Sequence, residues 1–582
     1  GVYNFDILDR YLDLIADYGM KATISFRHYD GNGEYRWQKY TRQRSFDNIE
    51  INQHYYGSFD FSDSRIADAW KDAAHKVWLR YKKHPAFLGY YFYSVAGELS
   101  IIDKPWHGIN VGHNLASAAA FRQYLKEELS MTLTDLNSRW HTGFESWDEV
   151  QTPQPTYEMG PVPDLRMQWI DFCTFKRYQD MRYWYEMIVH HVRSFDNHHL
   201  IICHNGTAVP IKNHGLQDYS HNGGNHWKQG EKSLLAAWEK GTGQITEPHN
   251  PHAWATYGDP EERGWVLDHS IYCMLSQGGG GCANLGTYWL NRPEHLIDHY
   301  GKFFAYDRVE KFRPILNELV QTRLVMDAPE IGIIQDDYTL FSKHRTVFAP
   351  RSKDLQRWQE LLKIDGLAYS EMILPNGEWS PDLEQFKLLV PNALDEVMSF
   401  RNIQKLDELV RAGACMVMPA TVGRYCPEKK GEDFVLLNRL GIQPPKGEFS
   451  LVGMDIHANV TVENPFFNMG KRFAFYTTEQ QKAESQSDIV KTDDLFWRWP
   501  YRWLPVSNYF GCFAGNMQTN GKVFAQFPNG AVAMSLHQVG KGQVVVIWGT
   551  PDYKPELYSG FMVAMAEWAG VTIAGDNPMP YM

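Results

Sequence analysis

The chain has 582 residues, of which 43% are hydrophobic and 22% charged, so two or three globular domains with sizeable cores are expected. The formal net charge of −12 argues against a general nucleic-acid or anionic-membrane binder, and no apolar run is long enough to span a bilayer. The seven cysteines form no CxxC, and their odd number fits no closed disulfide framework, so reduced thiols are expected.

From residue 1 to about 320 the pattern alternates between strands and helices, as in repeated βα units. Amphipathic helices are predicted in GVYNFDILDRYLDLIADYG, at Ser64–Tyr81, at Met167–Val192 and at Glu262–Leu275. The predicted strands are Lys21–Arg27, Phe87–Val95, His199–His204, Asp218–Ser220, Gly243–Thr246 and Cys282–Tyr288.

Two glutamates end short apolar runs in this region. Glu98 ends FLGYYFYSVAG, and Glu247 ends GTGQIT just before Pro248, which is typical of the carboxyl tip of a buried parallel strand. In a βα barrel these tips meet at one mouth, and two carboxylic acids there are the minimal equipment of a glycosidase. The structural alternative is that one or both of them cap a helix or pair with a surface arginine.

The pattern changes near Met326–Glu330. EIGIIQDD and FKLLVPNA are predicted strands with a helix at Asp354–Ile364 between them, and a second helix leads to the predicted strand CMVMPA. This alternation predicts an open doubly wound α/β sheet, and the sequence lacks a dinucleotide-binding fingerprint. We therefore predict a barrel domain at residues 1–325 and an α/β domain at 326–582, with an irregular insertion at about 440–520, a β-hairpin around Gly540–Gly542 and a closing helix.

One stretch, FRQYLKEELSMTLTDLNSRWHTGFESWDEVQTPQP, resembles the family-42 glycoside hydrolases, which are mostly β-galactosidases, and HPAFLGYYF is similar to that family's entry into its fourth strand. The resemblance implies a (β/α)8 TIM barrel followed by an open flavodoxin- or glutamine-amidotransferase-like α/β domain similar to the family's trimerisation domain. If Glu98 ends the fourth barrel strand, KATISF is the third, and two strands should precede it. The first two strands are therefore expected to be missing from this sequence.

The resemblance also implies roles for the two glutamates in a retaining mechanism. Glu98 would be the general acid/base and Glu247 the nucleophile, with their carboxyl groups about 5–5.5 Å apart. The family's clan usually has Asn before the acid/base, whereas this chain has Gly97, so recognition of the sugar 2-hydroxyl must come from elsewhere. The AGEL tetrapeptide is similar to the acid-bearing strand of β-amylases, which invert, so the stereochemical outcome stays open.

Further polar and aromatic residues near strand ends are candidates for binding the sugar. Trp289 is the candidate sugar platform, with a core position as its equal alternative, and loop packing is the alternative for the others. The remaining candidates are Arg27, His204, Asn205, Trp227 and Trp254.

Two other classes of function remain open. Several histidines near strand ends would suit a metal-dependent barrel hydrolase, although HxH and HExxH are absent; the other class is a non-catalytic sugar-binding barrel. The favoured hypothesis is a glycosidase that acts on an oligosaccharide or glycoside without metal or cofactor. It is expected to bind neither nucleic acid nor membrane and to assemble as a homo-oligomer, with the trimer as the expected state. No signal peptide is visible, and a cytoplasmic and a periplasmic location both remain open.

Overall fold

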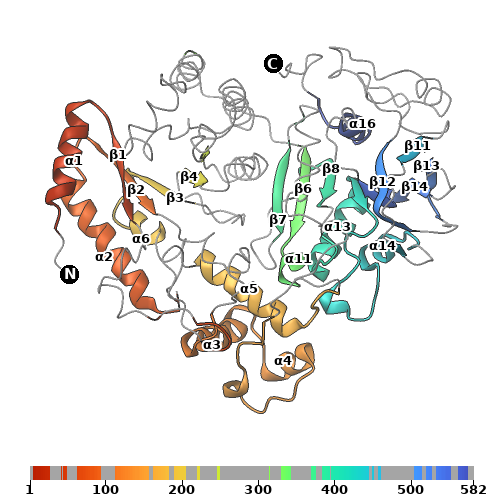
Figure 1. Cartoon of the computed structure of the whole chain (residues 1–582), viewed down its shortest axis with the longest axis horizontal. Coiled ribbons are helices and arrows are strands. Elements are labelled where there is room, and N and C mark those ends of the chain that lie inside the picture. Colours follow the sequence, from red (N-terminus) through yellow and green to blue (C-terminus); the bar gives the residue numbers. More distant parts are fainter. Residues whose placement is uncertain are drawn as a thin grey trace. The chain divides into compact units, whose positions relative to one another are not determined.

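The computed structural model describes residues 4–26, 41, 44–48, 60, 62–92, 112–155, 162–182, 189–204, 219–222, 245–248, 314, 330–342, 367, 369–374, 383–392, 395–444, 449–450, 457–460, 504–513, 519–526, 532–551 and 561–573. The chain divides into two compact units (Figure 1). Unit 1 comprises residues 1–155 and 172–327, and unit 2 comprises residues 156–171 and 328–582. Residues 156–171, which the sequence pattern placed in the first domain, thus group with the second unit.

In the described residues of unit 1, five parallel strands form a sheet whose spatial order follows the chain order. Successive strands that pair in parallel, each followed by a crossover, are the repeating element of a (β/α) barrel. The strands are β1 (Ala22–Phe26), β2 (Phe87–Phe92), β3 (Leu200–His204), β4 (Tyr219–Asn222) and β5 (Ile245–Pro248).

The helices of unit 1 follow the predicted amphipathic patterns closely. Helix α2 has the predicted bounds, Ser64–Tyr81, begins at the N-cap Asp63 and buries Ile66, Trp70 and Val77 on one face. The predicted helix at Met167–Val192 is helical in both of its described parts, α5 and α6, and residues 183–188 between them lie outside the described residues. The other helices are α1 (Asp6–Asp17), α3 (Leu115–Gln123), a π-helix (Tyr124–Glu128), α4 (Leu133–Trp140), a 3-10 turn (Trp147–Glu149), α5 (Met167–Arg182) and α6 (His190–Arg193).

Unit 2 contains parallel strands in the spatial order β7-β6-β8-β9-β15. Numbered along the chain, this is the 2-1-3-4-5 order of flavodoxin-like doubly wound sheets. The strands are β6 (Ile331–Asp336), β7 (Ser370–Leu374), β8 (Leu388–Pro391), β9 (Cys415–Pro419) and β15 (Gly542–Ile547). Its helical elements are α11 (Tyr338–Phe341), α13 (Phe400–Ala412), a 3-10 turn (Pro427–Lys429), α14 (Val435–Leu440) and α16 (Phe561–Trp568).

The sheet continues beyond β15 with antiparallel strands. The predicted hairpin is confirmed: β14 pairs with β15 around Gly540, whose positive φ of 60° suits the turn and whose missing side chain avoids the Arg411 backbone. The expectation of an irregular segment at about 440–520 is wrong in part, because β10, β11 and β12 lie there and pair with partners distant in sequence. These strands are β10 (Phe449–Ser450), β11 (His457–Val460), β12 (Leu504–Phe513), β13 (Lys522–Gln526), β14 (Val532–Val539) and β16 (Gly549–Pro551).

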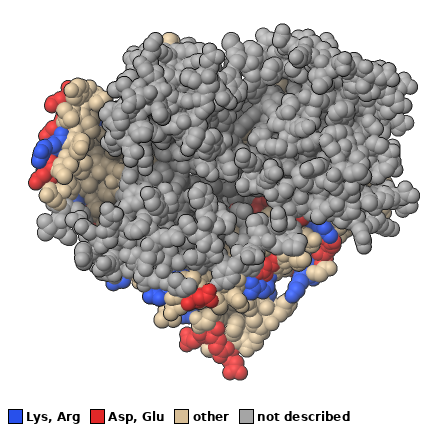
Figure 2. All heavy atoms as spheres, viewed as in Figure 1, with Lys and Arg blue, Asp and Glu red and all other residues tan. Residues whose placement is uncertain are grey.

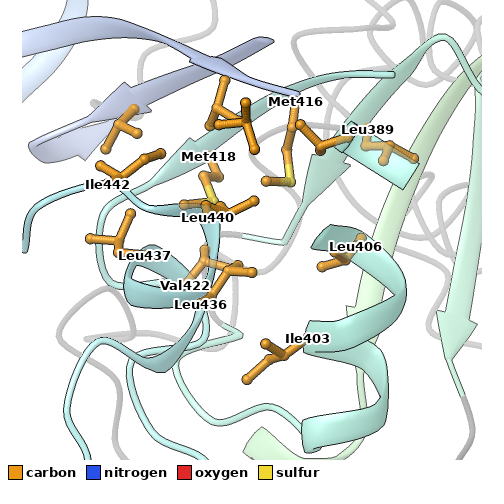
Figure 3. Close-up of a cluster of buried hydrophobic side chains, with 14 of the residues drawn as sticks. Leu389, Ile403, Leu406, Met416, Met418, Val422, Leu436, Leu437, Leu440 and Ile442 are labelled. Atoms are coloured by element: carbon orange, nitrogen blue, oxygen red, sulfur yellow. The ribbon is translucent and has the colours of Figure 1, made fainter. Parts of the chain in front are cut away.

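An apolar cluster joins several of the described elements of unit 2 (Figure 3). Met416 and Met418 from β9 meet Ile403 and Leu406 from α13, and α14 adds Leu436, Leu437 and Leu440. All of them are fully or almost fully buried. The apolar face of α13 that the sequence predicted is therefore the face that covers the sheet.

The described surface carries charge of both signs. Figure 2 shows one face of the molecule, and acidic and basic side chains are interspersed on the described part of that face. In that part of the chain, none of the helices combines the length and the apolar composition needed to cross a membrane.

Two buried carboxyl groups lie at the carboxyl ends of β6 and β8. Asp336 accepts hydrogen bonds from the Tyr338 amide (2.9 Å), the Ser399 amide (3.0 Å) and the Asn402 side chain (2.8 Å), while its own amide donates to Asp395 Oδ2 (2.9 Å). Burial raises the pKa of Asp336 to about 7, and burial together with the charge of Asp336 raises the pKa of Asp395 well above its ordinary value. At pH values between their ordinary and their raised pKa, these carboxyl groups therefore hold protons in the folded protein and release them in the unfolded one.

We expect Asp395→Asn to make unit 2 more stable at pH 8 and to leave it almost unchanged at pH 4. Because both folded pKa values are raised, the contribution of the two groups to stability is fully present below about pH 4 and is lost as the pH rises through their folded pKa values, which is about 7 for Asp336. Asn keeps the acceptor for the Asp336 amide without a charge, so the gain at pH 8 should reach about 1 kcal/mol or more. Amide hydrogen exchange in β6, β8 and α13 measures it.

The matched control is Asp407→Asn. Asp407 is also buried, but it pairs with Arg411 Nε at 2.7 Å, so its loss should destabilise unit 2 at pH 8. Faster exchange in Asp395→Asn than in the wild type at pH 8 would contradict the assignment of a raised pKa.

Candidate active site

The carboxyl ends of β3, β4 and β5 bring three polar residues into one row. His204 is paired in register with His221, and His221 with Glu247. Because the strands are parallel and neighbouring strands lie about 4.7–4.9 Å apart, the three backbones stand side by side at one edge of the sheet. This is the edge at which parallel α/β sheets carry their ligands and catalytic groups.

The other predicted site residues lie outside the described residues. These are Glu98, Arg27, Asn205, Trp227, Trp254 and Trp289, and the predicted separation of the Glu98 and Glu247 carboxyl groups lies outside them as well. The structure therefore brings together Glu247 and His204 of the predicted set, at the level of the backbone, and adds His221.

The segments that follow β1 and β2 are tied to each other by hydrogen bonds. Asp60, which precedes α2 and is fully buried, accepts hydrogen bonds from the Ser62 amide (2.9 Å), from the Asn114 side chain and from Ser117 Oγ (2.6 Å) at the start of α3. The amides of Gly112 and His113 both donate to the Arg44 carbonyl at 3.1 Å. These contacts join the β1–α2 connection to the β2–α3 connection.

The contacts that join these two connections lie at the carboxyl side of the strands. Helix α2 ends at Tyr81, six positions before β2 begins at Phe87 (87 − 81), and the Ala22 amide donates to the Ala86 carbonyl at the amino ends of β1 and β2. A helix of 18 residues spans about 27 Å, so the start of α2 lies at the far, carboxyl end of these strands. Asp60 stands next to that start.

A buried histidine and a buried lysine lie next to the contacts that join the two connections. His113 Nδ1 lies 3.0 Å from Thr152 Oγ1, and Lys176 Nζ donates to Gln179 Oε1 at 2.8 Å. Gln179 in turn donates to Ser62 Oγ at 2.7 Å. Burial, reinforced by the positive charge of Lys176, lowers the pKa of His113 to about 3, so this imidazole is neutral at physiological pH.

A second buried carboxylate marks the opposite end of the strands. Asp196, just before β3, accepts a hydrogen bond from the Tyr90 hydroxyl at 2.7 Å and from the amides of His198 and His199 at 3.1 Å. Burial alone would raise the pKa of Asp196, but these hydrogen bonds outweigh it and hold the pKa below its ordinary value. This group stabilises the amino end of the sheet.

Sequence reasoning did not single out Asp60, His113 or Lys176. Nothing in the local pattern distinguishes Asp60 from a surface residue of a polar loop, and its burial depends on side chains more than 50 positions away. Asn114 could have been noticed as an N-cap, since its side chain accepts from the Ser117 amide at 2.8 Å.

Among the residues whose side chains the structure describes, no three His, Cys, Asp or Glu groups lie close enough to hold a metal ion. The side chains of His204, His221 and Glu247 are outside that set.

Comparison with known proteins shows a similarity in the first part of the chain. Residues 1–225 match the model of glycoside hydrolase family 42, described as beta-galactosidase. The match covers 225 of the 582 residues, so it relates the first part of the chain to this family.

Solved structures with the same fold include three β-galactosidases. That of Rahnella sp. R3 has 16% identity and a TM-score of 0.66, and the match covers 100% of this chain and 83% of that one. That of Bacillus circulans sp. alkalophilus has 13% identity and a TM-score of 0.65, with 98% and 82% covered. That of Halorubrum lacusprofundi has 14% identity and a TM-score of 0.63, with 98% and 83% covered.

The structural likeness extends over nearly the whole chain, and at these identities it concerns the fold. None of the curated protein sequences compared with the chain matches it.

Proposed function

We propose that the protein is a retaining glycoside hydrolase that cleaves a terminal β-glycoside of the β-galactoside kind, with Glu98 as acid/base and Glu247 as nucleophile. The observation that carries the proposal is the position of Glu247 in β5, in register with His221 and His204 at the carboxyl edge of a parallel sheet. The family-42 match of residues 1–225 and the fold shared with β-galactosidases support it.

The chemistry needs two carboxyl groups in opposite protonation states. The Glu247 carboxylate attacks the anomeric carbon and the glycosidic C–O bond breaks, while the Glu98 carboxylic acid gives its proton to the leaving oxygen. In the second step the Glu98 carboxylate takes a proton from water, the water oxygen attacks the anomeric carbon, and the bond to Glu247 breaks. The sugar leaves with its original configuration.

Residues on the strand-end segments would bind the sugar. Trp289 is proposed as the stacking platform, and His204 or Asn205 is proposed to recognise the 2-hydroxyl, since Gly97 offers no side chain for it. Arg27, Trp227 and Trp254 are proposed to line the remainder of the site.

A panel of aryl glycosides assayed with the purified protein tests the function. We expect hydrolysis of one or a few β-glycosides, with proton NMR showing the β-anomer of the sugar as the first product. The α-anomer as first product would replace the retaining mechanism with an inverting one, as the AGEL likeness to β-amylases allows. Sugar binding without any hydrolysis would favour the non-catalytic barrel.

One observation favours a second candidate function, metal-dependent hydrolysis. The row of His204, His221 and Glu247 has the two-His, one-Glu composition of some catalytic zinc sites. Elemental analysis of active protein decides between the two: about one equivalent of zinc, with activity lost on chelation and restored by zinc, would establish the metal reading, whereas full activity after exhaustive chelation favours the two-carboxylate mechanism.

We propose that unit 2 serves assembly, as a trimerisation-like domain beside a catalytic barrel. Its parallel strands have the flavodoxin-like order, and the sequence has no nucleotide fingerprint after β6. Multi-angle light scattering should give three times the chain mass of 67.4 kDa at micromolar concentration. A mass equal to one chain at that concentration would contradict the assembly role.

A further inference from the structure

Two connections at the carboxyl edge of the sheet in unit 2 are joined to each other by backbone hydrogen bonds. The first leads from β8 to α13 and is described at residues 395–399, and the second leads from β9 to α14 at residues 420–434. The Gly423 amide donates to the Asp395 carbonyl at 2.7 Å, and two further backbone bonds, at 2.8 and 3.0 Å, are made by Tyr425. A movement of the first connection therefore has to move or release the second.

Two buried carboxyl groups hold the first connection against β6. Asp395 Oδ2 accepts a hydrogen bond from the Asp336 amide, and Asp336 Oδ2 accepts from the Ser399 amide at the end of the connection and from the Asn402 side chain in α13. The two Asp residues are 3% and 4% exposed. Among the described residues, neither of them forms an ion pair with Lys or Arg.

This arrangement is stable only while the pair holds protons. An ionised carboxylate without a counter-charge is costly to bury, and a second one beside it adds repulsion. The raised pKa values of Asp336 and Asp395 agree with this geometry, and the negative charge of Asp337 contributes to both. Opening the connection would let water solvate the two carboxylates, so opening and loss of protons favour each other.

The cations on the neighbouring described elements do not offset the charge of the pair. Arg424 pairs with Asp433 at 2.7 Å, and Lys429 Nζ lies 4.6 Å from the centroid of the Phe400 ring. The other charged or titratable groups on the described parts of α11, of the two connections and of the first turn of α13 are Tyr338, Glu396, Arg401, Tyr425, Glu428, Lys430 and Glu432.

We propose that Asp336 and Asp395 form a pH-sensitive switch, which releases the β8–α13 and β9–α14 connections together as the pair loses protons with rising pH, while the parallel sheet beneath them stays formed. Between the ordinary and the raised pKa, each proton lost on opening makes opening about tenfold more favourable per pH unit. Strands β8 and β9 remain, because their ladder bonds and the apolar cluster beneath do not involve the pair.

Cysteine alkylation of the full chain tests the switch. Cys426 lies in the β9–α14 connection and is 1% exposed, whereas Cys415 lies in β9 itself. Iodoacetamide labelling followed by peptide mass spectrometry gives the rate at each thiol in the wild type and in Asp395→Asn at pH 6, 7 and 8. Dividing the two rates at each pH cancels the pH dependence of the thiol chemistry.

We expect the wild-type to Asp395→Asn rate ratio for Cys426 to rise at least about tenfold from pH 6 to pH 8, because the variant lacks the proton that the wild type loses on opening. The ratio for Cys415 should stay constant. A constant ratio for Cys426 would overturn the switch. A parallel rise at Cys415 would overturn it as well, since the whole sheet would then be opening.

Thr339→Val is the matched control without a charge. Thr339 Oγ1 donates to the Val397 carbonyl at 3.0 Å and accepts from the Val397 amide at 3.1 Å, so its loss loosens the same connection. Labelling of Cys426 should rise by the same factor at pH 6 and pH 8. A factor that differs between the two pH values would show that the pH dependence comes from another group and would contradict the assignment to the pair.

Amide hydrogen exchange of the wild type decides if Asp395→Asn does not fold. Protection of the Gly423 and Tyr425 amides, corrected for the intrinsic exchange rate at each pH, should fall at least about tenfold from pH 6 to pH 8. Protection of the β9 amides should not change. Equal changes in both sets, or none in either, would overturn the switch.

Discussion

Glu247→Gln should lower kcat on the order of 10⁴-fold or more while the protein stays folded. The change keeps the size of the side chain but removes the negative oxygen that must attack the anomeric carbon, so no glycosyl-enzyme intermediate can form. Steady-state kinetics on an activated aryl glycoside measures the loss, because with such a substrate the attack itself limits the rate.

Covalent labelling identifies the attacking group directly. A 2-fluoro glycoside of the preferred sugar should accumulate on Glu247, as peptide mass spectrometry would show. The matched control is Glu330→Gln, which removes a surface carboxylate paired with Lys387 at 2.6 Å in unit 2 and should leave kcat unchanged. A label on any other carboxyl group would refute the assignment of the nucleophile.

Glu98→Ala should reduce turnover of substrates with poor leaving groups by roughly 10²- to 10⁴-fold and affect dinitrophenyl glycosides far less in their first step. The reason is that an alkoxide leaving group needs a proton in the transition state, whereas dinitrophenolate is stable without one. A plot of log kcat/KM against leaving-group pKa should therefore become steep in the variant.

Azide gives an independent readout for the same variant. Without the acid/base, water attacks the intermediate slowly, and azide, which needs no general base, should accelerate turnover and yield the β-glycosyl azide. Equal losses on all leaving groups, with no azide product, would make Glu98 a structural residue.

Much of the architecture could be predicted from local pattern, since short apolar runs and 3.6-residue periodicity reflect burial that each element imposes by itself. Helix α2 has its predicted bounds because its apolar stripe and the cap at Asp63 are both local, and the β14–β15 hairpin follows from the glycine turn between two apolar strands. The strands β10, β11 and β12 were missed because their pairing partners are distant in the sequence and because β10 and β11, at two and four residues, are too short to give a clear pattern.

For the candidate site, the sequence by itself determined which polar residues end each strand, and so placed Glu247 and His204 at strand tips. The reason is that a polar residue after a buried apolar run has to lie where the strand leaves the core. Only the tertiary structure decided which tips are neighbours: the parallel register sets His204, His221 and Glu247 in one row, and backbone hydrogen bonding between strands, which no local pattern encodes, fixes that register. The burial of Asp60 was likewise decided by tertiary structure, since its donors Asn114 and Ser117 come from another connection. A carboxylate becomes buried and fully hydrogen-bonded only when the fold brings such donors to it.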